Sequence, residues 1–278
     1  MVKISKNDKS AVISKQGGEL IALCHREKNL LWGRDPAVWA SSAPLLFPIC
    51  GRLRDNTYYH KGNTYTLTPH GFAKRMLYQI AQQTDDSVRL TIRDNDETFK
   101  SYPFSFEFSV TYTMTEQGLQ VVFTVSNHSG EELPFSLGGH WGFALGESIE
   151  NYALRFDAPV SLSREILDGA YLSGEKEMLQ VQGDTLPLSY HICDNDTWVI
   201  RDAPSACTLL LKGREVVRLE YPDSPHLLIW TKPQARFVCL EPWNGMPDGD
   251  KCGEITQKDS IHLLAPHQEQ NFTHKIIF

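Results

Sequence analysis

The feature that most constrains the fold is a strict alternation of apolar and polar side chains over residues 104–114, where every second residue is Phe, Val, Tyr or Met. Successive side chains of a strand point to opposite faces of a sheet, so this pattern predicts a strand with one buried face. The turn sequence TEQG follows at residues 115–118, and the alternation resumes at residues 119–125. The two segments therefore predict an antiparallel hairpin.

Short strands are predicted along most of the remaining chain, at residues 88–92, 152–156, 197–200, 207–211, 216–221, 227–231, 236–240 and 274–278. The helical signal is limited to residues 35–39, where an N-cap candidate precedes a proline, and to a short turn at 163–167. The sequence has no amphipathic helix of three or more turns, no repeat and no low-complexity linker. We therefore predict one all-β domain over residues 1–278, built from large antiparallel sheets with few short helices.

Charge, apolar segments and cysteine spacing limit which partners and which cellular compartment we expect for this protein. The formal net charge of -7 and the pI of about 5.8 argue against nucleic acid or an anionic membrane surface as the main partner. The N-terminal residues lack the apolar segment of a signal peptide, and no apolar run approaches the roughly 18 residues that span a bilayer. The six cysteines have no CxxC spacing, so no zinc or redox motif follows from them, and buried free thiols are favoured over disulfides. We expect a cytoplasmic protein with reduced cysteines.

Glu241 is the leading candidate for chemistry, because it stands where an apolar strand meets the turn sequence Pro242-Trp243. Most strand-end glutamates are simply solvated, but apolar neighbours would raise the pKa of this carboxyl toward the range of a general base. His140 lies in the sequence LGGHWGF, where glycines allow close approach of the backbone and an imidazole can exchange protons near neutral pH. The bland alternative is a strand-end histidine whose glycines serve a bulge.

Two further candidates carry weaker signals. His70, in the sequence TPHGFAKR, is typical of a loop histidine, and Arg52, in ICGRLR, has a donor fork that suits sugar hydroxyls or an anionic oxygen. Trp141 and Trp243 flank the suspected acid and base and could stack on a sugar ring, whereas most tryptophans are expected in the core. Motifs for dinucleotides, phosphate loops, serine hydrolysis and zinc proteases are absent. One carboxylate and two imidazoles therefore indicate proton-transfer chemistry.

Ten short motifs lie in order along the chain: GGEL at 17–20, NLLW at 29–32, DPAVW at 35–39, APLLFPI at 43–49, GR at 51–52, HGFA at 70–73, YPF at 102–104, PFSLGGH at 134–140, WTKP at 230–233 and LEPW at 240–243. Together they resemble the aldose 1-epimerase (mutarotase) family, and most closely its LacX-like branch. The resemblance covers nearly the whole chain. It implies the galactose-mutarotase-like fold, a large antiparallel β-sandwich with a sugar cleft on one face, and an isomerase without metal or cofactor.

The resemblance also implies roles for single residues. The family's catalytic histidine lies in a Gly-x-His-Pro-x-Phe pattern, which His140 matches with Trp141 in place of the proline. Glu241 corresponds to the family's glutamate base. A protonated His140 and an ionised Glu241 would then open and close the pyranose ring of the substrate. The expected partner is a small sugar, and the protein is expected to be a monomer or a homodimer. The family's substrate-binding positions correspond to Arg52, His70 and, as the candidate aspartate, Asp196.

Three alternatives stay open at this point. A hexose-6-phosphate 1-epimerase on the same fold would need cations for a dianion, and the available ones are Arg52, Arg54, Lys74 and Arg75. A sugar-binding protein without catalysis is suggested by Trp141 in place of the proline. A metal-dependent oxygenase could use two histidines and a glutamate, but such sites usually carry His-x-His, which this sequence lacks.

Overall fold

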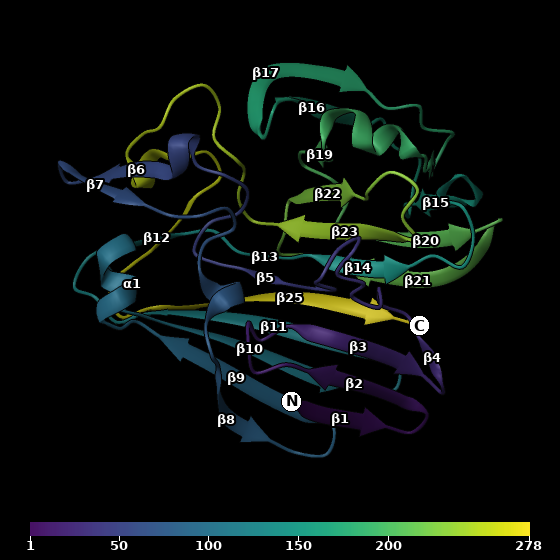
Figure 1. The fold of residues 1–278 in the computed structure, drawn as a ribbon, viewed down its shortest axis with the longest axis horizontal. Coiled ribbons are helices and arrows are strands. Elements are labelled where there is room, and N and C mark those ends of the chain that lie inside the picture. Colours follow the sequence, from purple (N-terminus) through teal and green to yellow (C-terminus); the bar gives the residue numbers. More distant parts are fainter.

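Two large antiparallel sheets make up most of the computed structural model, which describes residues 1–278 apart from the side chain of Asn195. Figure 1 shows the first sheet running from the blue strands near the bottom of the molecule to the green strands at its right. Its nine strands are, in spatial order, β18 (Thr185–Pro187), β15 (Tyr152–Arg155), β20 (Ala206–Leu211), β21 (Arg214–Glu220), β25 (Glu269–Ile277), β11 (Gly118–Asn127), β10 (Phe106–Met114), β9 (Ser87–Arg93) and β8 (Gln79–Gln83).

The second sheet lies above the first in the same view (Figure 1). It carries the candidate site described below. Its spatial order is β17 (Tyr171–Met178), β16 (Ser163–Asp168), β19 (Trp198–Ile200), β22 (His226–Trp230), β23 (Phe237–Trp243), β13 (Gly138–Gly139) and β5 (Leu45–Leu46), with β14 (Trp141–Ala144) also paired to β23.

Smaller elements complete the fold. A four-stranded sheet contains β1 (Val2–Lys6), β2 (Lys9–Ile13), β3 (Leu20–His25) and β4 (Lys28–Asn29), and two-stranded pairs join β12 (Leu133–Phe135) to β24 (His262–Leu264) and β6 (Thr57–His60) to β7 (Asn63–Thr66). The α-helix is α1 (Asp96–Ser101), and the 3-10 helices are η1 (Arg54–Asn56), η2 (Ala73–Arg75), η3 (Ile149–Asn151), η4 (Tyr190–Asn195) and η5 (Ile255–Gln257). Within the described part of the chain, no helix has the length and apolarity to cross a membrane.

The core fills the space between the two large sheets. The apolar face of β10 is fully buried, and its polar residues point the other way, as the alternation predicts. The rings of Phe47, which follows β5, and Phe108 of β10 stack 4.5 Å apart and join the two sheets. Burying an aromatic side chain of this size contributes roughly 1.5–3 kcal/mol, so these contacts are a main source of stability.

The strand predictions are largely confirmed, including the hairpin of β10 and β11, which pairs Phe106 with Asn127 and Met114 with Leu119. The predicted all-β sandwich is likewise confirmed. Two local predictions differ from the structure, and one helix was not predicted. Residues 35–39 form one isolated turn rather than a helix, although the Asp35 side chain accepts a hydrogen bond from the backbone of Ala37.

Residues 163–167, predicted as a turn, belong to strand β16, because β17 and β19 offer pairing partners on both sides. Helix α1 has no counterpart among the predictions. It is held by Asn95, whose side chain accepts from the backbone of Glu97 and Thr98 in a capping box.

Replacing a core ring tests the importance of the contact between the sheets. We expect Phe108→Ala to lower the free energy of unfolding by about 3–5 kcal/mol, because it removes a buried ring and leaves a cavity. Phe99→Ala is the matched control, since Phe99 is 41% exposed, and it should change the free energy by under about 1 kcal/mol. Urea denaturation of both variants measures the difference, and equal losses would contradict the assignment.

Candidate active site

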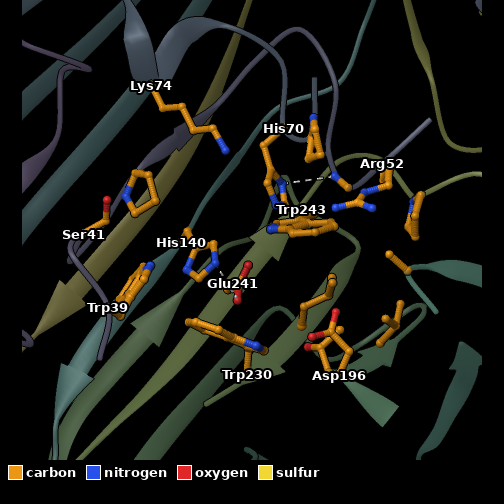
Figure 2. A pocket seen from close by; sticks show the side chains of 18 of the residues that line it. Trp39, Ser41, Arg52, His70, Lys74, His140, Asp196, Trp230, Glu241 and Trp243 are labelled. Carbon is orange, nitrogen blue, oxygen red and sulfur yellow. Dashed lines mark hydrogen bonds and ion pairs between the residues drawn. The ribbon is translucent and has the colours of Figure 1, made fainter. Parts of the chain in front are cut away.

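A cavity of about 540 Å³ opens on the face of the second sheet that points away from the sandwich core. Alternate residues of β22 and β23 divide between the two faces, as a strand requires. Leu227 and Leu240 join the core, whereas Leu228 and Glu241 line the cavity. Figure 2 shows the side chains that converge on it from strands and loops, among them Trp39, Arg52, His70, Lys74, His140, Asp196, Trp230, Glu241 and Trp243.

Glu241 lies inside β23, two residues before its end, rather than at the strand-to-loop junction that the sequence indicates. Its side chain is only 3% exposed. Burial raises the pKa of this carboxyl well above its ordinary value, and the negative charge of Asp196 raises it further. A carboxyl in this environment retains its proton far more readily than one in water.

His140 lies between β13 and β14, directly across from Glu241. Its Nε2 atom is 3.2 Å from Glu241 Oε1, and its side chain is 12% exposed. The preceding glycine is required, because a Cβ on Gly139 would lie 2.4 Å from the ring of Trp141. Loss of hydration lowers the pKa of His140 to about 3, and the positive charge of Lys74 acts in the same direction.

Both shifts run against the charge state that the family resemblance implies for this pair. An imidazolium facing a carboxylate is disfavoured, because both charged forms lose hydration at this depth. Burial favours a neutral imidazole and a protonated carboxyl instead, which places a single proton between the two residues. That arrangement stores one transferable proton at the contact between the groups.

His70 enters the cavity from a loop with a left-handed backbone, at φ 63°. Its Nδ1 atom accepts a hydrogen bond from the backbone N–H of Gly51 at 3.2 Å, so a neutral ring carries its proton on Nε2. Gly71 follows at φ 69°, and a Cβ there would lie 2.2 Å from the carbonyl oxygen of Phe47. Desolvation lowers the pKa of His70 well below its ordinary value, with Lys74 as the next cause.

The basic residues separate into two groups. Arg52, Lys74 and Arg75 line the cavity. Arg54 does not, because its guanidinium donates to the Gly249 carbonyl and stacks on the ring of Tyr171, 3.6 Å from the centroid. Among the described residues, neither Arg52 nor Lys74 forms an ion pair or a side-chain hydrogen bond.

Asp196, which follows η4, lines the same cavity on the side opposite Lys74 (Figure 2). Its backbone has φ 65° and ψ -60°, which non-glycine residues rarely adopt. The sequence singled it out only through its resemblance to the family's aspartate. The structure therefore brings together Arg52, His70, Asp196, His140 and Glu241.

Of the two tryptophans predicted to stack on a sugar ring, Trp141 does not line the cavity. Trp141 is fully buried and points into the sandwich core, so it cannot stack on a ligand. Trp39 and Trp230 form walls beside His140 instead, with ring centroids 5.1 and 5.5 Å from the imidazole. Both lie within quoted motifs, DPAVW and WTKP, which gave the only signal for them. Trp243 lines the cavity as expected.

One set of side chains could also hold a metal ion. The ligand atoms of His140, Cys239 and Glu241 lie within 4.8 Å of one another, the single group of this kind in the described part of the chain. Burial raises the pKa of the Cys239 thiol well above its ordinary value. Metal binding there would have to displace a firmly held proton.

The fold as a whole is that of the galactose mutarotase-like proteins. The structure overlays on a galactose mutarotase-like protein from Lactobacillus casei ATCC 334 with a TM-score of 0.95 and 27% identity, covering 100% of this chain and 99% of that chain. A galactose mutarotase related enzyme from Lactobacillus acidophilus gives a TM-score of 0.92 and 30% identity, covering 99% and 96%.

The chain belongs to the aldose 1-epimerase family, whose model matches residues 1–258. The chromosomal protein LacX of Lactococcus lactis subsp. lactis is 28% identical over 273 residues, which are 90% of each chain. The uncharacterized protein YphB of Escherichia coli K12 is 25% identical over 234 residues, or 75% of this chain and 74% of that one. The family resemblance of the ten motifs is thereby confirmed.

The protonation state of His140 can be measured directly. We expect its imidazole to stay neutral from pH 8 down to about pH 4, because burial lowers its pKa to about 3 from an ordinary value near 6.5. Nitrogen chemical shifts of ¹⁵N-histidine-labelled protein, assigned with the His140→Asn variant, report the charge at each pH. A cationic His140 ring at pH 7 would show that the pair is ionic instead.

Proposed function

We propose that this protein is an aldose 1-epimerase, an isomerase that interconverts the α and β anomers of an aldohexose without a cofactor. The observation that carries the proposal is the contact of His140 with Glu241, 3.2 Å apart at the floor of a tryptophan-walled cavity. Anomerisation requires one proton to leave the substrate and one to arrive, and nothing else. A small sugar is the expected partner.

Ring opening requires two coordinated proton transfers. Glu241 removes the proton of the C1 hydroxyl while His140 delivers a proton to O5, and the C1–O5 bond breaks as C1 becomes an aldehyde. Rotation about the C1–C2 bond turns the other face of the aldehyde toward O5. Reclosure reverses both transfers, so the two residues regain their starting protons and no other reactant is consumed.

The stored proton makes this sequence accessible to a buried pair. At rest, burial favours the proton on Glu241 and leaves His140 neutral. Transfer of that proton across the 3.2 Å contact converts Glu241 into the base and His140 into the acid. Because the two atoms are in direct contact, the proton passes between them without an intervening water, and the charged pair that results is a transient state that burial disfavours at rest.

The remaining cavity residues bind and orient the sugar in this proposal. Arg52 and the Nε2–H of His70 are donors aimed at the ring oxygen region, where negative charge develops during opening. Asp196 is an acceptor for a sugar hydroxyl. Trp39 and Trp230 present apolar faces to the C–H groups of the pyranose.

Polarimetry tests the proposal and both catalytic roles. Freshly dissolved α-D-glucose and α-D-galactose should reach equilibrium faster with wild-type protein, and Glu241→Gln or His140→Asn should each lower kcat by about 10²-fold or more. Glu150→Gln serves as the control, because Glu150 is an exposed carboxylate that does not line the cavity. Ordinary turnover by folded Glu241→Gln would remove the base assignment, and sugar binding without acceleration would indicate a binding protein.

A second substrate, a hexose 6-phosphate, is favoured by the charges that line the cavity. Lys74 is half-buried and has no partner among the described residues, and loss of hydration lowers its pKa to about 8, with Arg75 as a second cause. An unpaired ammonium in such a place gains most from an anionic ligand. Arg52 could supply a second donor to the same phosphate.

The two substrates are distinguished by comparing rates. If the natural sugar is phosphorylated, kcat/KM should be higher for glucose 6-phosphate or galactose 6-phosphate than for the free sugar. Lys74→Met should then lower the phosphosugar value by about 10- to 100-fold, the worth of one charge-assisted hydrogen bond. Lys100→Met is a matched control, because Lys100 is exposed on α1 and pairs with Glu97. Equal values for free and phosphorylated sugar would remove this candidate.

A further inference from the structure

Four buried polar side chains form a continuous hydrogen-bonded chain on the core side of the second sheet: Trp141, His274, Ser224 and Asn244. We propose that His274 is a positioning residue, which acts through this chain to fix the spacing between His140 and Glu241. The inference rests on the proposed function for its catalytic meaning. The chain of hydrogen bonds itself is a feature of the fold.

The contacts run without a gap from β14 to the end of β23. Trp141 Nε1 donates to His274 Nδ1 at 3.2 Å, and His274 Nε2 is 2.9 Å from Ser224 Oγ. Ser224 Oγ donates to Asn244 Oδ1 at 2.8 Å, and Asn244 Nδ2 donates to the carbonyl of Asp223. All four side chains belong to residues that are at most 1% exposed.

The chemistry of the end groups assigns every proton in this chain. An indole N–H can only donate, so Nδ1 of His274 must be the acceptor. Burial lowers the pKa of His274 to about 3, so the ring is neutral and carries its proton on Nε2. Nε2–H therefore donates to Ser224, whose hydroxyl is then free to donate to Asn244. A fully satisfied network of this kind admits one arrangement and resists small displacements.

Both ends of the network lie beside the catalytic pair. Trp141 directly follows His140, and its side chain points to the core because neighbouring residues of a strand face opposite ways. Asn244 is three residues beyond Glu241, and its backbone N–H donates to the carbonyl of Leu137 at 2.9 Å. The network thus connects the strand segment of the acid with that of the base.

His274 supplies the fixed point, because it belongs to β25 in the other large sheet. Its ring also packs against Phe123 of β11, with centroids 5.1 Å apart. A proton transfer across 3.2 Å is sensitive to displacements of a few tenths of an ångström. The network holds that distance from behind the sheet, without any contact between His274 and a substrate.

Kinetics of three single variants and one double variant test the positioning role. We expect Trp141→Phe, which keeps the ring and loses the N–H, and His274→Phe to lower kcat about 10-fold or more with KM for the sugar nearly unchanged. Because His274→Phe already removes the hydrogen bond between Trp141 and His274, the double variant should resemble His274→Phe alone. Phe272→Leu is the control, since Phe272 is buried on the same strand and its ring packs against Phe135 and His262, which lie outside the network. It should destabilise the fold and leave kcat within about 2-fold.

A second readout does not depend on catalysis. In ¹⁵N-histidine-labelled wild-type protein, His274 should show the fixed Nε2–H tautomer, and Trp141→Phe should shift the ring signals of His140, whereas Phe272→Leu should not. Losses of kcat that follow stability in all three variants, or unchanged His140 signals in Trp141→Phe, would overturn the proposal. A wild-type protein without epimerase activity would overturn the proposed function alone, because the nitrogen signals still report whether the network positions His140.

Discussion

The burial of Glu241 against His140 is the constraint on which the rest of the site depends. An isolated carboxylate or imidazolium at this depth would be strongly disfavoured, because little replaces the lost water. Each group has the other as its partner at 3.2 Å, and burial favours the neutral form of both. Register then fixes their geometry: β14 pairs Trp141 with Leu240 of β23, so the histidine and the glutamate beside these residues meet across neighbouring strands. The two residues proposed to transfer protons are thus held by a sheet, whereas His70 and Asp196 enter the cavity from outside its strands.

Strands with one solvent-exposed face and one buried face can be predicted from the sequence, and these make up much of the fold. The hairpin of β10 and β11 is the clearest case, because its alternation has a single explanation. Strand β23 is buried on both faces, so its apolar run contains no signal for the direction in which Glu241 points. Residues 163–167 have helix-compatible composition, and only partners distant in the sequence make them a strand.

The candidate site was predictable at the level of residue types and motifs, and less so in its physics. Ordered motifs pointed to His140 and Glu241, but the opposite pKa shifts of the two groups follow from burial, which a sequence does not state. Trp141 was expected beside the sugar but lies in the core, whereas Trp230 lines the cavity although most tryptophans were expected in the core. One register step decides which face of a sheet a strand residue occupies. Asp196 reaches the cavity only through an unusual backbone conformation.

The position of β25 has a consequence for how the chain acquires its site. This strand pairs with β11, joining Phe272 to Phe123 across a very long stretch of intervening sequence. Pairings of such separation close large loops and are slow to form, so they belong to the late stages of folding. A partly folded chain would therefore hold His140 and Glu241, the proposed acid and base, on strands whose mutual alignment is still loose. Chemical competence in this architecture is a property of the completed sandwich, acquired when its two layers lock together.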